Sequence, residues 1–156
     1  MKYSVAALLR KKLNDDKFLV VKRPLNDNEH PGLWGLPAIS FNTPEKPEDA
    51  FKRIGEEKLG CKILPINFIG ALFQKRPYGK FILFLYEGIV VEGEPDVKKG
   101  YKGTIYVDQK WTNDYTILFP IAKKGSACAL ILLNYLGKIE EKDIIEKVTE
   151  EMLKGY

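Results

Sequence analysis

The sequence contains few of the residue types that bind zinc. It has one histidine, His30, and two cysteines, Cys61 and Cys128, which lie far apart in the chain. Their spacing matches no structural zinc site. Both cysteines lie beside apolar residues, so we expect them to pack as small hydrophobic side chains. A zinc site is therefore not expected.

Long apolar runs are also missing. The longest, at residues 81–86 and 127–133, are far shorter than the roughly 18 residues that a membrane span requires. The first residues, MKYSVAALLRKK, have too short an apolar part for a secretory signal. These absences predict a cytoplasmic protein with no membrane partner.

The positive charge of the chain is modest and dispersed. The formal net charge is +4, and no block of Lys and Arg exceeds two or three residues. Such a distribution favours a charged surface exposed to water over a nucleic-acid patch, so no nucleic-acid partner is expected. The surplus of positive charge still favours a small phosphorylated ligand over a cationic one.

The overall composition is typical of one globular domain. The 156 residues, of which 45% are hydrophobic and 29% charged, suit a single domain spanning residues 1–156 with a core of ordinary size. Glutamine is scarce, with only Gln74 and Gln109, whereas Lys, Glu and Ile are plentiful. That balance favours a thermophilic source.

Apolar runs and turn residues predict a series of strands and helices. The β-branched and aliphatic runs at 3–10 and 18–23 flank a turn and predict a hairpin. A helix is predicted from Pro47 to about Lys58, with Gly60 just past its end. The other expected elements are a short apolar element at 33–37, an antiparallel hairpin of strands at 63–74 and 80–91, a strand near 104–107, and helices at 121–136 and 139–153. This order predicts an α/β domain with a mixed β-sheet between helices.

The segment 33–61, LWGLPAISFNTPEKPEDAFKRIGEEKLGC, carries the most informative pattern. It resembles the signature of the Nudix (MutT-like) family, G-x5-E-x7-R-E-U-x-E-E-x-G-U, in which U is a bulky aliphatic residue. Aligned without gaps, the first Glu of the signature falls on Glu45, its Arg on Arg53, the first Glu of the pair on Glu57 and the last Gly on Gly60. The preceding HPGLWGLP resembles the usual lead-in.

The resemblance covers residues 3–61 well; beyond them it is limited to element order and the helix around KKGSACALILLNYL. It implies a Nudix-like α/β/α sandwich with a mixed β-sheet. It also implies hydrolysis of a nucleoside diphosphate derivative with Mg²⁺ or Mn²⁺, since carboxylates one helical turn apart share a face and hard cations take oxygen ligands. The implied site residues are Glu57 and Glu56 for catalysis, Glu57, Glu56 and Glu45 for the metal, and Arg23, Arg53 and Trp34 for the substrate.

Several positions depart from the signature. Ile54 replaces the Glu that follows the Arg, Lys58 replaces the second Glu of the pair, and Ala38-Ile39 replaces a Gly pair that allows close backbone approach. Ile54 cannot bind a metal. At about 4 Å and an effective dielectric near 20, the Lys58 ammonium would repel each unit of positive charge by about 4 kcal/mol, unless its stem extends into water. The motif is therefore degenerate.

A register shifted by one residue is an alternative. It places Glu56 and Glu57 on the paired carboxylates and Ile54 on an aliphatic position, but it requires a deletion before Ala50. We favour the ungapped register. Both registers lack the first helical Glu.

The same residues also have structural interpretations. The charges at 56–58 suit a solvated helix end, and Arg53 can pair with Glu57 four residues later. Trp34 can anchor the core, and His30 can pack within its loop. These interpretations compete with the functional ones at each position.

Two functions therefore stay open. The first is a divergent Nudix-type hydrolase of a nucleoside diphosphate derivative, in which Glu57 holds Mg²⁺. The second is a non-catalytic nucleotide-binding or protein-interaction module on the same fold, which the loss of metal ligands favours. The expected small-molecule partner is a nucleotide or another small diphosphate, and residues 123–126 would meet a phosphate near a helix start. Either function allows a homodimer.

Overall fold

Two β-sheets lie at the centre of the computed structural model, which describes residues 1–144. The first sheet has the strand order β4-β1-β6-β5, and the second has the order β3-β2-β7. β1 and β6 run parallel whereas the other pairs are antiparallel, so the first sheet is mixed. The strands are β1 (Lys2–Arg10), β2 (Phe18–Lys22), β3 (Trp34–Gly35), β4 (Ala38–Ser40), β5 (Lys62–Arg76), β6 (Gly79–Glu92) and β7 (Asp108–Thr112).

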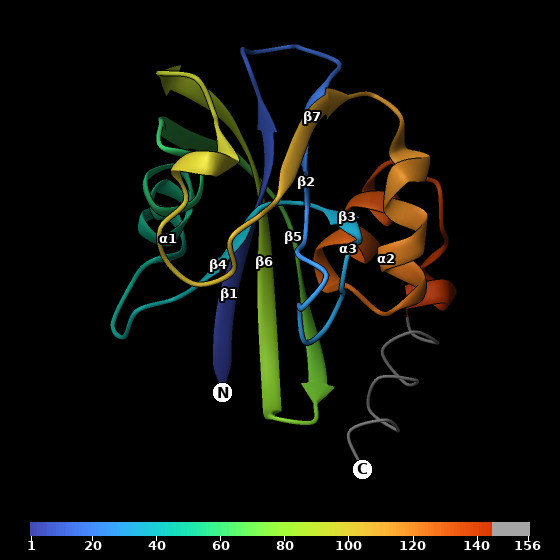
Figure 1. The fold of residues 1–156 in the computed structure, drawn as a ribbon. Helices are drawn as coiled ribbons and strands as arrows, with labels where there is room; N and C mark the ends of the chain where they lie inside the picture. Colours follow the sequence, from blue (N-terminus) through green and yellow to red (C-terminus); the bar gives the residue numbers. More distant parts are fainter. Residues whose placement is uncertain (145–156) are drawn as a thin grey trace.

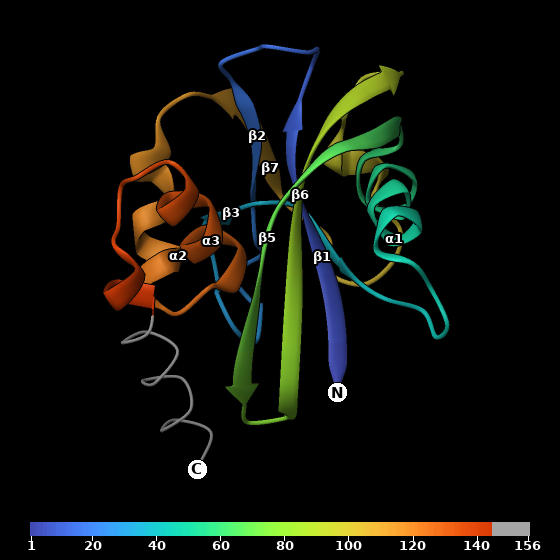
Figure 2. The ribbon, with the colours of Figure 1, turned by 180° about the vertical axis from the view of Figure 1, so that it is seen from behind.

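Helices cover both sides of these sheets, with α1 on one side and α2 and α3 on the other (Figures 1 and 2). The helices are α1 (Pro47–Ile54), α2 (Phe119–Lys123) and α3 (Ala127–Tyr135); a π-helical turn, Gly55–Leu59, continues α1, and 3₁₀ turns lie at Val97–Lys99 and Tyr115–Leu118. The predicted α/β/α sandwich with a mixed sheet is confirmed. Within the described residues, no helix is both long and apolar enough to cross a membrane.

β1 separates two hydrophobic cores. Successive residues of a strand point to opposite faces of the sheet, so Ala6 and Leu8 pack in the core that contains α3, whereas Val5 and Leu9 pack in the core that contains α1. Because both faces are covered, the strand has a nearly continuous apolar run. Ile54 belongs to the α1 core and has no exposed surface.

The strands predicted at 3–10 and 18–23 are confirmed, but their pairing as a hairpin is wrong. β1 pairs with β4 and β6, whereas β2 pairs with β3 and β7. The connection between them, residues 11–17, is longer than the 2–5 residues of an ordinary hairpin loop, which lets the two strands enter different sheets. The hairpin predicted further along the chain is confirmed by β5 and β6.

The bounds of other predicted elements differ from those in the structure. The strand expected near 104–107 lies later, at β7, although the Val107 N–H already donates to Lys22 O at 2.9 Å. The helix expected over 121–136 is interrupted, because Gly125 has a φ of +89° and separates α2 from α3. Most of the helix predicted at 139–153 lies outside the described residues.

Candidate functional site

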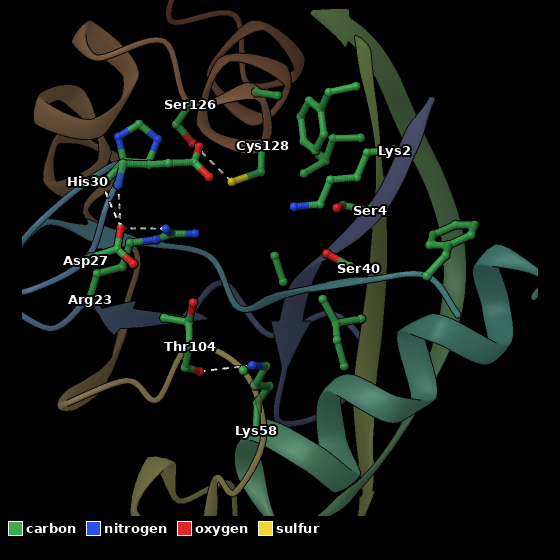
Figure 3. Close-up of a pocket in the computed structure, with 18 of the residues that line it drawn as sticks. Lys2, Ser4, Arg23, Asp27, His30, Ser40, Lys58, Thr104, Ser126 and Cys128 are labelled. Atoms are coloured by element: carbon green, nitrogen blue, oxygen red, sulfur yellow. Dashed lines mark hydrogen bonds and ion pairs between the residues drawn. The ribbon is translucent and has the colours of Figure 1, made fainter. Parts of the chain in front are cut away.

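A cleft of about 410 Å³ opens where the end of α1, the start of α3, the first sheet and the loop that follows β2 meet. In Figure 3, Lys2 and Ser4 of β1 lie on one side of it, opposite Arg23, Asp27 and His30. Ser126, which precedes α3, and Cys128 of α3 lie at one end, and Lys58 with Thr104 at the other. Six of the residues that line it are Lys or Arg and three are Asp or Glu: Lys2, Arg23, Arg53, Lys58, Arg76 and Lys102, and Asp27, Glu29 and Glu57. The cleft is therefore positively charged.

Arg53 ties two carboxylates together at the edge of this cleft. Its Nε and Nη2 donate to the two oxygens of Glu45, each at 2.7 Å, and its Nη1 donates to Glu57 Oε2 at 2.8 Å. Nη2 also donates to Ser40 O. The Arg53 guanidinium lowers the pKa of the Glu45 carboxyl, and the Asn42 N–H adds to that effect. The structural pairing of Arg53 with Glu57 is confirmed, and the three residues that the ungapped register aligns with the signature, Glu45, Arg53 and Glu57, lie together.

The π-helical turn decides which side chains face the cleft. Gly55 begins it, and a Cβ added there would lie 2.6 Å from Cys61 O, so only glycine fits without a shift of the chain. Glu57 is 7% exposed and lines the cleft. Glu56 is exposed and lines a separate hollow beside Lys52. Glu56 thus lies apart from the cleft that Glu57 lines, and its assistance to Glu57 in catalysis and metal binding stays a prediction.

Lys58 is held inside the protein rather than extended into water. It is 5% exposed, and its Nζ donates to Lys102 O and to Thr104 O, the latter at 2.9 Å. Gly103 lies between these carbonyls with a φ of +68°, and a Cβ there would lie 2.7 Å from Nζ. The sequence therefore needs glycine at this position. We call this arrangement of two carbonyl oxygens around Nζ the Lys58 clasp.

The electrostatic surroundings of Lys58 are unfavourable for a cation. Burial lowers the pKa of the ammonium, and the positive charges of Arg23 and Arg53 lower it further. The Glu57 carboxylate acts in the opposite direction, but it also neutralises Arg53. The buried positive charge of Lys58 therefore shares the negative charge of Glu57 with Arg53.

These residues do not fit the Mg²⁺ or Mn²⁺ that the signature implies. Ile54 occupies the core where the signature has its first helical carboxylate, and both oxygens of Glu45 already accept hydrogen bonds from Arg53. Lys58 brings an ammonium where a second carboxylate would be needed. In the part of the chain that the structure describes, no three His, Cys, Asp or Glu side chains are grouped to hold a metal ion.

On the side of the cleft opposite β1, Asp27 connects Arg23 and His30 through hydrogen bonds. Its Oδ2 accepts hydrogen bonds from Arg23 Nη1 and from the N–H of His30, both at 2.8 Å. His30 is 5% exposed, and its Nδ1 has no hydrogen-bond partner among residues 1–144. Burial, together with the charges of Arg23 and Arg76, lowers the pKa of His30 to about 4, so the imidazole is neutral at pH 7.

Trp34 is not part of the cleft. It is half-buried, packs against the core that contains α3, and has Lys110 Nζ 5.4 Å from its ring centroid. This packing agrees with the interpretation of Trp34 as a core anchor, and its role in substrate binding stays a prediction. Ser126, by contrast, does line the cleft, where its Oγ lies 3.3 Å from Cys128 Sγ.

Sequence reasoning missed the residues of the Lys58 clasp. The segment GYKGT, residues 100–104, contains two glycines, which was a signal for an unusual backbone but gave no indication that the segment would meet residue 58. Lys2 was also missed as a cleft residue, since it lies at the end of a strand far from the motif.

No family model matches the sequence. A MutT protein from Methanosarcina mazei Go1 is similar in structure with a TM-score of 0.64 at 18% identity, covering 88% of this chain and 91% of that one. The chain has a Nudix fold. A Nudix hydrolase from Nitrosomonas europaea (TM-score 0.63, 21% identity, 88% and 86% covered) and an ADP-ribose pyrophosphatase from Streptococcus suis 89-1591 (TM-score 0.52, 16% identity, 96% and 90% covered) are also similar. The likeness of the Nudix fold says nothing by itself of activity.

Proposed function

We propose that this Nudix-fold chain is a non-catalytic module that binds a small phosphorylated molecule, a nucleotide or another diphosphate, in the cleft beside Glu57 and Lys58. The observation that carries the proposal is the excess of Lys and Arg over Asp and Glu in the lining. Opposed low-dielectric walls with one sign of charge concentrate ligands of the other sign.

The size of the cleft agrees with such a ligand. Small-molecule sites usually measure about 300–1,000 Å³, and this one measures about 410 Å³. Arg23 uses one N–H of its guanidinium for Asp27, and a guanidinium carries five donors in a fork that suits phosphate oxygens. Arg23 is therefore the side chain we expect to contact the ligand first.

The chemistry of the carboxylates favours binding over hydrolysis. Glu57 is the one predicted helical carboxylate that reaches the cleft, and its Oε2 accepts from Arg53. A hydrolase would need a positioned group to activate water, and losing one commonly costs about 10²–10⁴-fold in rate. The hydrolase remains the alternative that the following experiment is designed to detect.

Isothermal titration calorimetry with ADP-ribose, ADP and pyrophosphate tests the proposal. ADP-ribose is included because one of the similar structures is an ADP-ribose pyrophosphatase. Product formation is followed in parallel with Mg²⁺ and Mn²⁺. We expect micromolar binding of at least one compound without turnover, weakened by Arg23→Gln but not by Lys12→Gln, a matched change at an exposed lysine. Turnover that disappears in Glu57→Gln would establish the hydrolase instead, and no binding of any compound would refute the proposal.

A further inference from the structure

The buried Lys58 ammonium needs an explanation beyond packing. Lysine is almost never fully buried unless it is paired, because removing an ammonium from water is costly. Here the clasp offers two neutral carbonyl oxygens, at Lys102 and Thr104, and the nearby carboxylate of Glu57 also serves Arg53. An anion from solution would complete the charge balance.

The ammonium is also placed where a ligand can reach it. Lys58 lines the cleft together with Arg23, whose charge acts on it. Two of the three N–H donors of an ammonium are accounted for by the clasp. Because the carbonyls fix the position of Nζ, little side-chain entropy is left to lose when the third donor binds a ligand.

The clasp lies where the signature would place a metal ligand. With Lys58 in the position of the second paired Glu, the cleft carries its own cation instead of a group that attracts one. An ammonium can donate a hydrogen bond to a phosphate oxygen and attract it as a point charge, as lysine does in phosphate sites of other folds.

We propose that Lys58 is a built-in cation that binds a phosphate group of the ligand directly, so that recognition in this cleft requires no divalent metal. The inference rests on the proposed function, because it concerns the same cleft. It predicts a ligand class, phosphate esters and diphosphates in their metal-free form. It also predicts that the charge of the Lys58 ammonium contributes to the affinity for the ligand, in addition to any effect of the hydrogen bonds that hold residues 102–104 in place.

Calorimetric titration with inorganic pyrophosphate in EDTA, and again in Mg²⁺, tests the inference. The wild-type chain should bind at least as tightly in EDTA as in Mg²⁺. Two variants separate charge from tethering: Lys58→Gln keeps N–H donors for the carbonyls without the charge, and Lys58→Met removes both. Each should weaken binding by about 10- to 100-fold, the loss of one charge-assisted contact, while Lys12→Met leaves it unchanged.

The outcomes are distinguishable. Binding that appears only with Mg²⁺, or a Lys58→Gln variant that binds as tightly as the wild type, would overturn the inference and leave the proposed function standing. No binding in either buffer would overturn both. Because the EDTA comparison uses the wild-type chain, it stays decisive even if a variant fails to fold.

Discussion

Replacing Arg53 with methionine should destabilise the protein more than the loss of a surface ion pair would. Arg53, Glu45 and Glu57 have side-chain exposures of 16%, 11% and 9%. An exposed pair contributes at most about 1 kcal/mol, whereas breaking a fully buried pair costs about 3–5 kcal/mol. Since this network is mostly buried but borders an open cleft, we expect the free energy of unfolding to fall by about 2–3 kcal/mol.

Urea denaturation at pH 7 measures this loss. With an m-value of about 2 kcal/mol per molar urea, the midpoint should fall by about 1–1.5 M. Lys52→Met, at an exposed position of the same helix, is the control and should shift it little. The pKa of Glu45 is lowered in the folded state, so its contribution is present above its unfolded value of 4.5 and is lost as the pH falls through the folded value.

The difference between wild type and Arg53→Met should therefore shrink below about pH 4.5. Two results would contradict this account: a free energy of unfolding that falls by less than about 0.5 kcal/mol at pH 7, or a difference between the two proteins that stays the same in acid. Either would show that the ion pairs of Arg53 with Glu45 and Glu57 do not stabilise the fold. A double-mutant cycle with Glu45→Gln isolates the pair itself.

Three further results are expected. Gly55→Ala should lower stability by about 1–3 kcal/mol in urea denaturation, because its Cβ would lie 2.6 Å from a backbone oxygen; unchanged stability would mean that the π-helical turn is not required. Lys58→Glu should raise Mg²⁺ affinity in calorimetry by pairing a carboxylate with that of Glu57, and no gain would indicate that these two side chains do not face one point. For His30, the pKa of about 4 lies below the ordinary value of 6.5, so the unfolded chain binds more protons between these values and stability decreases as the pH is lowered from 6.5 to about 4. His30→Gln should flatten that part of the pH–stability curve, and a variant with the slope of the wild type would contradict the burial of a neutral imidazole.

The sequence predicted the scaffold better than the pairing of its strands. Strands such as β1 are recoverable because burial on both faces imposes a continuous apolar run. Which strands pair is decided by contacts between distant segments, so the turn at residues 14–16 gave a hairpin where the chain actually passes to another sheet. Local patterns carry no information on that choice.

The site was predictable only where the motif is local. Glu45, Arg53 and Glu57 were found because spacing along one helix and its lead-in brings them together. The clasp could not be found, since residues 102–104 reach Lys58 through tertiary structure across more than forty residues. The exception considered for Lys58, a stem that extends into water, does not occur, because the backbone around Gly103 offers the ammonium acceptors inside the protein.

Amide chemical shifts of the ¹⁵N-labelled chain, followed by NMR during titration with pyrophosphate in EDTA, test whether the cleft is an anion site. We predict saturable shifts at residues 102–104, Ser40 and Ser126, which border the cleft, with little change around Glu56 and Gly93 in the separate hollow. Saturable shifts confined to that hollow, or no shifts at millimolar pyrophosphate, would contradict the assignment of this cleft as a site for phosphorylated ligands.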